Sequence, residues 1–253
     1  MLIRLSVLLF VLVFPKSYAS DCADQPSLKI GIGSSWPPFV MYGTRPYGID
    51  VDITRAVFER AGFCIEFIQL PSSARGITEL EKGLIDVLPS ASFSVDRAKI
   101  AYFSSPYRRE KMRLFANKEI DLDSNLIELF SAGYTFTANP GAYYGEEVKQ
   151  IKKIDWYDRR LFEIASLDRR IEMVAKNRVD FLIEDEDAGY YYINKLGYQS
   201  IQLHPYVVND NAIHFMLGRH AFKRSDIERV NEAITNLNGT IANISEKYRK
   251  DSG

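Results

Sequence analysis

Cysteine and histidine are scarce in this sequence. Its 253 residues include two cysteines and three histidines. The histidines, His204, His214 and His220, show no metal-ligand spacing with the cysteines. We therefore expect no zinc site, and no other metal or cofactor.

Long apolar runs and an excess of one charge are also lacking. Beyond residue 19 no stretch approaches the ~20 apolar residues of a membrane-spanning helix. The formal net charge is −1, with Lys and Arg doublets scattered along the chain, so there is no basic face of the kind that nucleic acid requires. Hydrophobic residues make up 46% of the sequence, which is enough for a packed core. These features predict a soluble globular protein.

The first 19 residues have the pattern of a secretory signal peptide. A basic residue, Arg4, precedes an apolar run, and small residues at 17 and 19 precede an expected cleavage point near Ala19. The pattern predicts export to the periplasm. In that oxidising compartment we expect a disulfide between Cys22 and Cys64.

The order of apolar runs and helical patterns predicts an α/β fold. Residues 28–33, 64–70 and 85–88 have the composition of strands. Between them, residues 53–61 and 73–82 have helical patterns that each end at a glycine. Alternating strands and helices are typical of a doubly wound parallel sheet.

The same pattern starts again in the second half of the chain. Residues 82–88 and 176–182 share a helix end, a turn residue and a strand, with an aspartate at the same position, Asp86 or Asp180. We interpret this match as two lobes that are built alike.

The first candidate binding residues follow the strand at 85–88. Ser90 and Ser92 lie at its carboxyl end, where open α/β sheets bind their ligands. Arg97 has a planar guanidinium that can hold a carboxylate through two hydrogen bonds. Trp36, at the end of the first strand, precedes two prolines that would fix it as one wall of the site. The alternative is that Arg97 is a surface residue and that the serines merely end a strand.

Taken in order, several motifs resemble the family 3 extracellular solute-binding proteins of ABC transporters, which are periplasmic proteins of the amino-acid-binding type. The motifs are Trp36-Pro37-Pro38-Phe39, Gly48-Ile49-Asp50-Val51-Asp52, Gly83 with Asp86, Ser92 with Arg97, and Ser104-Ser105-Pro106-Tyr107. The resemblance implies a type II fold of two α/β lobes, with parallel-rich sheets flanked by helices. Two crossing strands would form the hinge.

The strand-like segment at 108–117 would lead the chain out of the first lobe, and strands at 201–203 and 212–217 would lead it back. On this basis the expected domains are a signal peptide at 1–19, lobe 1 at 20–112 and 208–253, and lobe 2 at 113–207.

The resemblance also implies roles for individual residues. Arg97 and Ser92 would hold the α-carboxylate of a ligand, Trp36 would pack on it, and Asp185 would hold its α-ammonium group. Where the family has Gly-Thr or Gly-Ser in lobe 2, this chain has Gly141-Ala142-Tyr143. This departure puts a standard amino acid ligand in question. Tyr143 is a further candidate contact.

Two more expectations concern the pocket. Arg75 would add a positive group to it, although a surface position is an equal alternative. Specificity would come from aromatic side chains, those of Trp36, Phe93, Tyr143 and Tyr144.

The expected function is capture of an amino acid or similar amine–carboxylate by lobe closure, in a monomeric protein that is not an enzyme. Its partner would be an inner-membrane ABC permease or a sensory receptor. The main rival is a cyclohexadienyl-dehydratase-like enzyme on the same scaffold, with Glu184 or Glu186 as proton donor.

Overall fold

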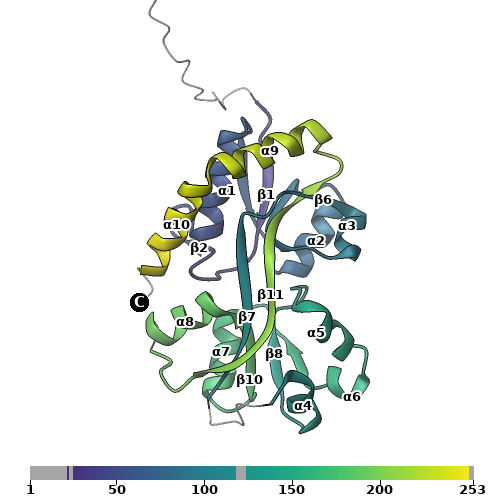
Figure 1. Ribbon diagram of the computed structural model, residues 1–253, viewed down its shortest axis with the longest axis vertical. Helices are drawn as coiled ribbons and strands as arrows, with labels where there is room; N and C mark the ends of the chain where they lie inside the picture. Colours follow the sequence, from purple (N-terminus) through teal and green to yellow (C-terminus); the bar gives the residue numbers. More distant parts are fainter. Residues whose placement is uncertain (1–21, 23–24, 118–123, 196, 251–253) are drawn as a thin grey trace, which may run out of the picture.

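In the computed structural model, the part of the chain that is described comprises residues 22, 25–117, 124–195 and 197–250. The expected signal peptide lies outside these residues. Figure 1 shows two α/β lobes, one above the other, which we call lobe 1 (upper) and lobe 2 (lower). Two long strands, β7 (Arg108–Ala116) and β11 (Gln202–Gly218), run between them. The predicted two-lobed α/β fold is confirmed.

Lobe 1 is built on parallel strands in the order β4, β1, β5, with β11 added antiparallel to β5. Its strands are β1 (Leu28–Ile32), β4 (Ile65–Gln69), β5 (Val87–Ser92) and β6 (Ala101–Phe103), with a hairpin of β2 (Met41–Tyr42) and β3 (Pro46–Tyr47). Its helices are α1 (Ile49–Arg60), α2 (Ser73–Glu81), α3 (Val95–Ile100), α9 (Arg224–Asn236) and α10 (Asn238–Lys250).

Lobe 2 has the same plan. Parallel strands follow in the order β9, β8, β10, and β7 is added antiparallel to β10. Its strands are β8 (Phe136–Ala138), β9 (Leu161–Glu163) and β10 (Phe181–Asp185). Its helices are α4 (Leu126–Ser131), α5 (Gly145–Ile151), α6 (Asp155–Asp158), α7 (Leu167–Ala175) and α8 (Glu186–Lys195).

The matched aspartates have matched roles. A carboxylate oxygen of Asp86, just before β5, accepts a hydrogen bond from the backbone N–H of Lys29 at 2.8 Å. Asp180, just before β10, accepts one from the N–H of Thr135 at 2.8 Å. Since β5 pairs with β1 and β10 pairs with β8, each aspartate ties its strand to the equivalent neighbour. The repeat in the sequence therefore corresponds to a structural repeat.

The returning connection differs from the sequence-based prediction. It is one strand, β11, of 17 residues, where two separate strands at 201–203 and 212–217 were expected. The pairing of β11 with β7 shifts register between His204 and Val207. Pro205, which has no N–H to donate, lies at this irregularity. The ladder with β7 continues on both sides of it, so the proline bends the strand without ending it.

Polar side chains cap several helix starts. Ser94 and Ser166 cap α3 and α7, each accepting a hydrogen bond from the backbone N–H of the third residue on. Helix α9 begins at Arg224, after Lys223. There the Asp226 carboxylate accepts from the N–H of Lys223 at 3.0 Å, and its charge lies in the first turn, where the helix dipole favours it.

The expected disulfide is present. Cys22 and Cys64 are bonded, with their Cα atoms 5.6 Å apart. Cys64 precedes β4, and β4 pairs in parallel with β1. The bridge therefore ties the start of the described chain to the edge of the lobe 1 sheet.

Among the described residues, no helix combines the length and the apolar composition that crossing a membrane would require.

Candidate ligand-binding site

A cavity of about 130 Å³ lies where the two lobes meet. One water needs about 10–15 Å³ of such space, so the cavity has room for a small organic molecule. Six of the expected pocket residues line it: Trp36, Ser90, Ser92, Arg97, Tyr143 and Tyr144. Lobe 1 contributes the first four of these and lobe 2 the last two.

Arg97 connects the two sides of the cavity. Its Nη1 donates to the carbonyl oxygen of Ser92 at 2.9 Å, and its Nη2 donates to the carbonyl oxygen of Gly141, in lobe 2, at 2.8 Å. A guanidinium has five N–H groups, so three remain beyond these two hydrogen bonds. Burial lowers the pKa of Arg97, an effect that the nearby Glu110 opposes. Arg97 therefore presents a desolvated cation to the cavity.

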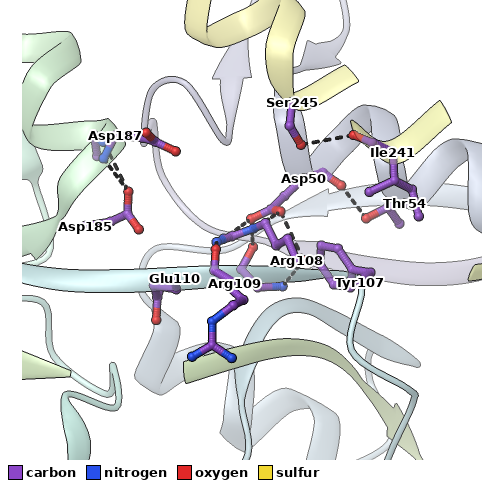
Figure 2. Close-up of polar contacts among 12 residues, drawn as sticks. Asp50, Thr54, Tyr107, Arg108, Arg109, Glu110, Asp185, Asp187, Ile241 and Ser245 are labelled. Carbon is purple, nitrogen blue, oxygen red and sulfur yellow. Dashed lines mark hydrogen bonds and ion pairs between the residues drawn. The ribbon is translucent and has the colours of Figure 1, made fainter. Parts of the chain in front are cut away.

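Ser90 belongs to a buried network behind the cavity wall. Its hydroxyl donates to Asp50, and its N–H donates to the hydroxyl of Tyr107 at 2.9 Å. Ser90 has φ of 58°, a left-handed conformation that is uncommon for residues other than glycine. Asp50 is in turn held by Arg108 through two hydrogen bonds of 2.7 Å, as Figure 2 shows. This network supports the end of β5, which carries Ser92.

Glu110 is a buried carboxylate in the cavity wall. On β7 the side chains alternate between the two faces, which places Glu110 and Met112 in the lining and Lys111 outside. Glu110 is 4% exposed, and its Oε2 accepts a long hydrogen bond of 3.4 Å from the Ser92 hydroxyl. Burial raises the pKa of Glu110 to about 7, although the charge of Arg108 opposes the shift. Its carboxylate is thus poorly compensated.

Glu184 joins the lobes on the other side of the cavity. Its Oε1 accepts a hydrogen bond from Trp36 Nε1 at 2.9 Å, and its Oε2 forms an ion pair with Arg170 at 2.7 Å. Glu184 and Arg170 are both buried. The Nε of Arg170 has no hydrogen-bond partner among the described residues, although it is buried. A polar group of a ligand would satisfy this donor.

Three of the expected pocket residues, Asp185, Arg75 and Phe93, lie outside the cavity lining. Asp185 is buried, and its Oδ1 accepts from the N–H groups of Asp187 and Ala188 at the start of α8, as Figure 2 shows for Asp187. Burial, with the charge of Glu110 adding to it, raises the pKa of Asp185. Arg75 is half exposed and pairs with Glu79. Phe93 is 51% exposed, and its ring packs edge to face against that of Phe103, with the centroids 5.2 Å apart.

The lobes also meet through polar contacts around the cavity. Asn139 Nδ2 donates to the hydroxyl of Ser73 at 3.2 Å, and Lys149 pairs with Asp96 at 3.1 Å. Gly141 approaches so closely that a Cβ atom there would lie 2.5 Å from the backbone nitrogen of Ala74. The described conformation is therefore one in which the lobes touch.

Three charged lining residues were not among the predicted ligand contacts: Glu110, Arg170 and Glu184, the last considered only as a catalytic acid. Glu110 had a usable signal, since it lies two residues from Met112 on a strand with alternating burial. Arg170 had a weaker one: it belongs to the Arg169-Arg170 doublet, a pattern typical of solvated surface, although it shares a helix face with Leu167, Ile171 and Val174. Within the described part of the chain, no group of three or more His, Cys, Asp or Glu side chains could hold a metal ion.

Comparison with solved structures shows the same fold in several proteins. A histidine kinase sensor domain with similarity to periplasmic binding proteins has a TM-score of 0.75 at 19% identity, covering 88% of this chain and 95% of that one. The arginine-, lysine-, histidine-binding protein ArtJ from Geobacillus stearothermophilus gives 0.73 at 17% identity, with 88% and 95% covered. AncCDT-1, an ancestral amino acid-binding protein described as a precursor of cyclohexadienyl dehydratase, gives 0.71 at 19% identity, with 88% and 95% covered.

Sequence comparison is informative at the level of the family. No curated protein sequence matches the chain significantly. Residues 28–251 match the bacterial extracellular solute-binding proteins, family 3, and this range includes both lobes, the two connecting strands and all the lining residues. The chain therefore belongs to family 3 of the bacterial extracellular solute-binding proteins.

Proposed function

We propose that this protein binds a small zwitterion, an amino acid or a similar amine–carboxylate, in the cavity between its lobes. The observation that carries the proposal is the charge arrangement around Ser92. Arg97 donates a hydrogen bond to the carbonyl oxygen of Ser92 and keeps three further N–H groups. Glu110 accepts a hydrogen bond from the hydroxyl of Ser92. A ligand with one carboxylate and one ammonium group would compensate both charges in a desolvated space.

Several roles follow from the resemblance to the family. Arg97 and Ser92 would hold the carboxylate, and Trp36 would pack on the ligand. Asp185 is the family's candidate for the ammonium group, and Tyr143 would contact the ligand from lobe 2. Because the ligand would make stronger contacts in the closed state than in the open state, its binding would favour closure of the lobes.

The proposed context is uptake from the periplasm. The mature protein, exported by its signal peptide, would deliver the ligand as a monomer to an inner-membrane ABC permease. The kinase sensor domain among the similar folds supports a second possibility, in which the partner is a sensory receptor.

The alternative function is that of an enzyme of the cyclohexadienyl dehydratase type. The similarity of the fold to that of AncCDT-1 supports this alternative. Such an enzyme needs a proton donor that faces the substrate. Glu184 lines the cavity, but hydrogen bonds from Trp36 and Arg170 occupy both of its oxygens. Glu186 pairs with Arg113 at 2.6 Å and lies outside the lining. The geometry of these two glutamates therefore does not favour either of them as the proton donor.

A thermal-shift screen tests the proposal. The mature protein is heated with each of the twenty standard L-amino acids, with diamines and with small carboxylic acids, and the screen is repeated with Arg97→Ala. A ligand at a hundredfold excess over its Kd stabilises the native state by about 2.7 kcal/mol. We expect an amino acid to raise Tm in the wild type and not in the variant. No shift with any amino acid, or a shift that survives Arg97→Ala, would contradict the proposal.

A further inference from the structure

Glu110 occupies a position that the proposed roles leave unused. It lies on β7, which runs between the lobes, and it faces the cavity. Its Oε2 makes the 3.4 Å contact with Ser92, and its Oε1 makes no hydrogen bond within the described part of the chain. A carboxylate that is 4% exposed and has one long hydrogen bond is costly to keep charged. An arriving cation would remove that cost.

The two protein cations that influence Glu110 are already engaged. Arg108, two residues earlier on β7, makes two hydrogen bonds of 2.7 Å to Asp50. Both side chains of this pair are buried, at 7% and 0% exposure. Arg97, the other cation near Glu110, donates to two backbone carbonyl oxygens. Neither arginine forms an ion pair with Glu110.

Asp185 is less available than Glu110. Its Oδ1 accepts two backbone N–H groups as the cap of α8, at 2.8 and 3.3 Å. These two bonds already compensate part of its charge, and Asp185 lies outside the lining of the cavity. Glu110 has only its long contact with Ser92.

We infer that the carboxylate of Glu110 binds the ammonium group of the ligand, next to the carboxylate that Arg97 and Ser92 hold. This inference rests on the proposed function and makes the ligand class narrower. In an α-amino acid both charged groups are attached to one carbon atom, so their partners must lie side by side. Arg97 and Glu110 meet this condition because both contact Ser92. A diamine, or an acid with a distant amine, does not fit the pair.

In this arrangement the two lobes contact different parts of the ligand. Ser92 and Arg97 belong to lobe 1, and Glu110 to the strand that leaves it, so the α-amino acid head binds on one side of the cavity. Lobe 2 then contacts the side chain of the ligand, with the unpaired Nε of Arg170 as one available donor.

Binding should also be linked to protonation. Burial raises the pKa of Glu110 to about 7, and an ammonium ligand binds the charged form. The charged and titratable groups that face Glu110 come from five elements and are Asp50 on α1, Arg97 on α3, Arg108 on β7, Tyr144 at the start of α5, and Glu184 and Asp185 on β10. Affinity should therefore rise with pH up to about 7 to 8, and binding near pH 7 should release a fraction of a proton.

Isothermal titration calorimetry provides the test. The probes are the twenty standard L-amino acids and, for the one that binds most tightly, the carboxylic acid that lacks only its α-ammonium group. The proteins are the mature wild type, Glu110→Gln, Asp185→Asn and, as a control outside the cavity, Glu186→Gln. Each titration is repeated at pH 6 and pH 8, in buffers that differ in ionisation enthalpy.

We expect Glu110→Gln to weaken amino acid binding at pH 8 by a factor of about 100 or more, consistent with loss of a buried charge contact. Proton release should disappear in this variant. Binding of the acid without the ammonium group should be unchanged or tighter, which also shows that the variant is folded. Glu186→Gln should match the wild type, and Asp185→Asn should lose less than tenfold.

Other outcomes separate the two proposals. If an amino acid binds the wild type, and Asp185→Asn abolishes binding while Glu110→Gln does not, the inference about Glu110 is overturned and the proposed function stands. If no amino acid binds the wild type, both are overturned.

Discussion

Glu110 links stability to function at the scale of a single residue. Its pKa is raised by burial from 4.5 to about 7 in the folded protein, so the folded state favours the neutral carboxyl group. The resulting penalty on stability is absent below about pH 4.5, grows as pH rises, and is complete above about pH 7. A residue that destabilises the empty protein in this way is typical of a binding site.

The isosteric variant Glu110→Gln should therefore stabilise the ligand-free protein at pH 8, by roughly 1–3 kcal/mol, and change its stability little at pH 4.5. Denaturant unfolding at the two pH values measures the difference. Glu66→Gln, at an exposed position on β4, should change stability little at either pH. A loss of stability in Glu110→Gln at pH 8, or an equal gain at both pH values, would contradict this assignment.

Several residues of the candidate site were predictable from the sequence, and others were not. Trp36, Ser90, Ser92 and Arg97 were predicted as site residues because they follow the carboxyl ends of strands, a position that topology alone connects with ligands. The cavity lining contains all four. Arg170 lies on a helix in the other lobe, and its position in the cavity depends on how the lobes pack. No local pattern encodes that packing.

At the scale of elements, the disulfide holds the edge of lobe 1. Cys22 and Cys64 are 42 residues apart in the chain, and a bond that closes a loop of this length stabilises the folded state by about 4 kcal/mol in the chain-entropy treatment.

The double variant Cys22→Ser, Cys64→Ser should lower the free energy of unfolding by an amount of this order, measured in denaturant at pH 7. Reducing agent should produce a similar change in the wild type and none in the variant. A variant as stable as the wild type would show that the bond does not constrain the unfolded chain.

Long periodic elements were predictable and short or irregular ones were not. The strands of lobe 1 and helix α1 follow clear apolar patterns. The two-residue strands β2 and β3 and the four-residue helix α6 are too short to show a period. β11 was divided in the prediction because Pro205 and the polar run at 209–211 resemble a turn. In the fold, pairing with β7 overrides that local preference.

At the scale of the whole molecule, two lobes must approach closely to form the cavity. Gly141 marks the closest point, since its φ of 80° suits glycine and a Cβ atom there would lie 2.5 Å from the Ala74 nitrogen. The proposed lobe boundaries, after residues 112 and 207, fall within β7 and β11, and these strands are the proposed hinge.

Gly141→Ala should therefore hold the lobes apart. We expect a larger radius of gyration by small-angle X-ray scattering, and weaker binding of the amino acid found in the thermal-shift screen. Gly239→Ala is the matched control, because a Cβ atom at this position meets no atom within 4 Å. An unchanged radius together with unchanged affinity would show that the lobes close without this contact.

The most direct measurement for the account is a crystal structure of the mature protein with the amino acid that stabilises it most. The account predicts the ligand in the cavity between the lobes, with its carboxylate within about 3 Å of the Arg97 guanidinium and its ammonium group within about 3 Å of a Glu110 oxygen. A ligand bound outside this cavity, or one whose carboxylate does not contact Arg97, would contradict it.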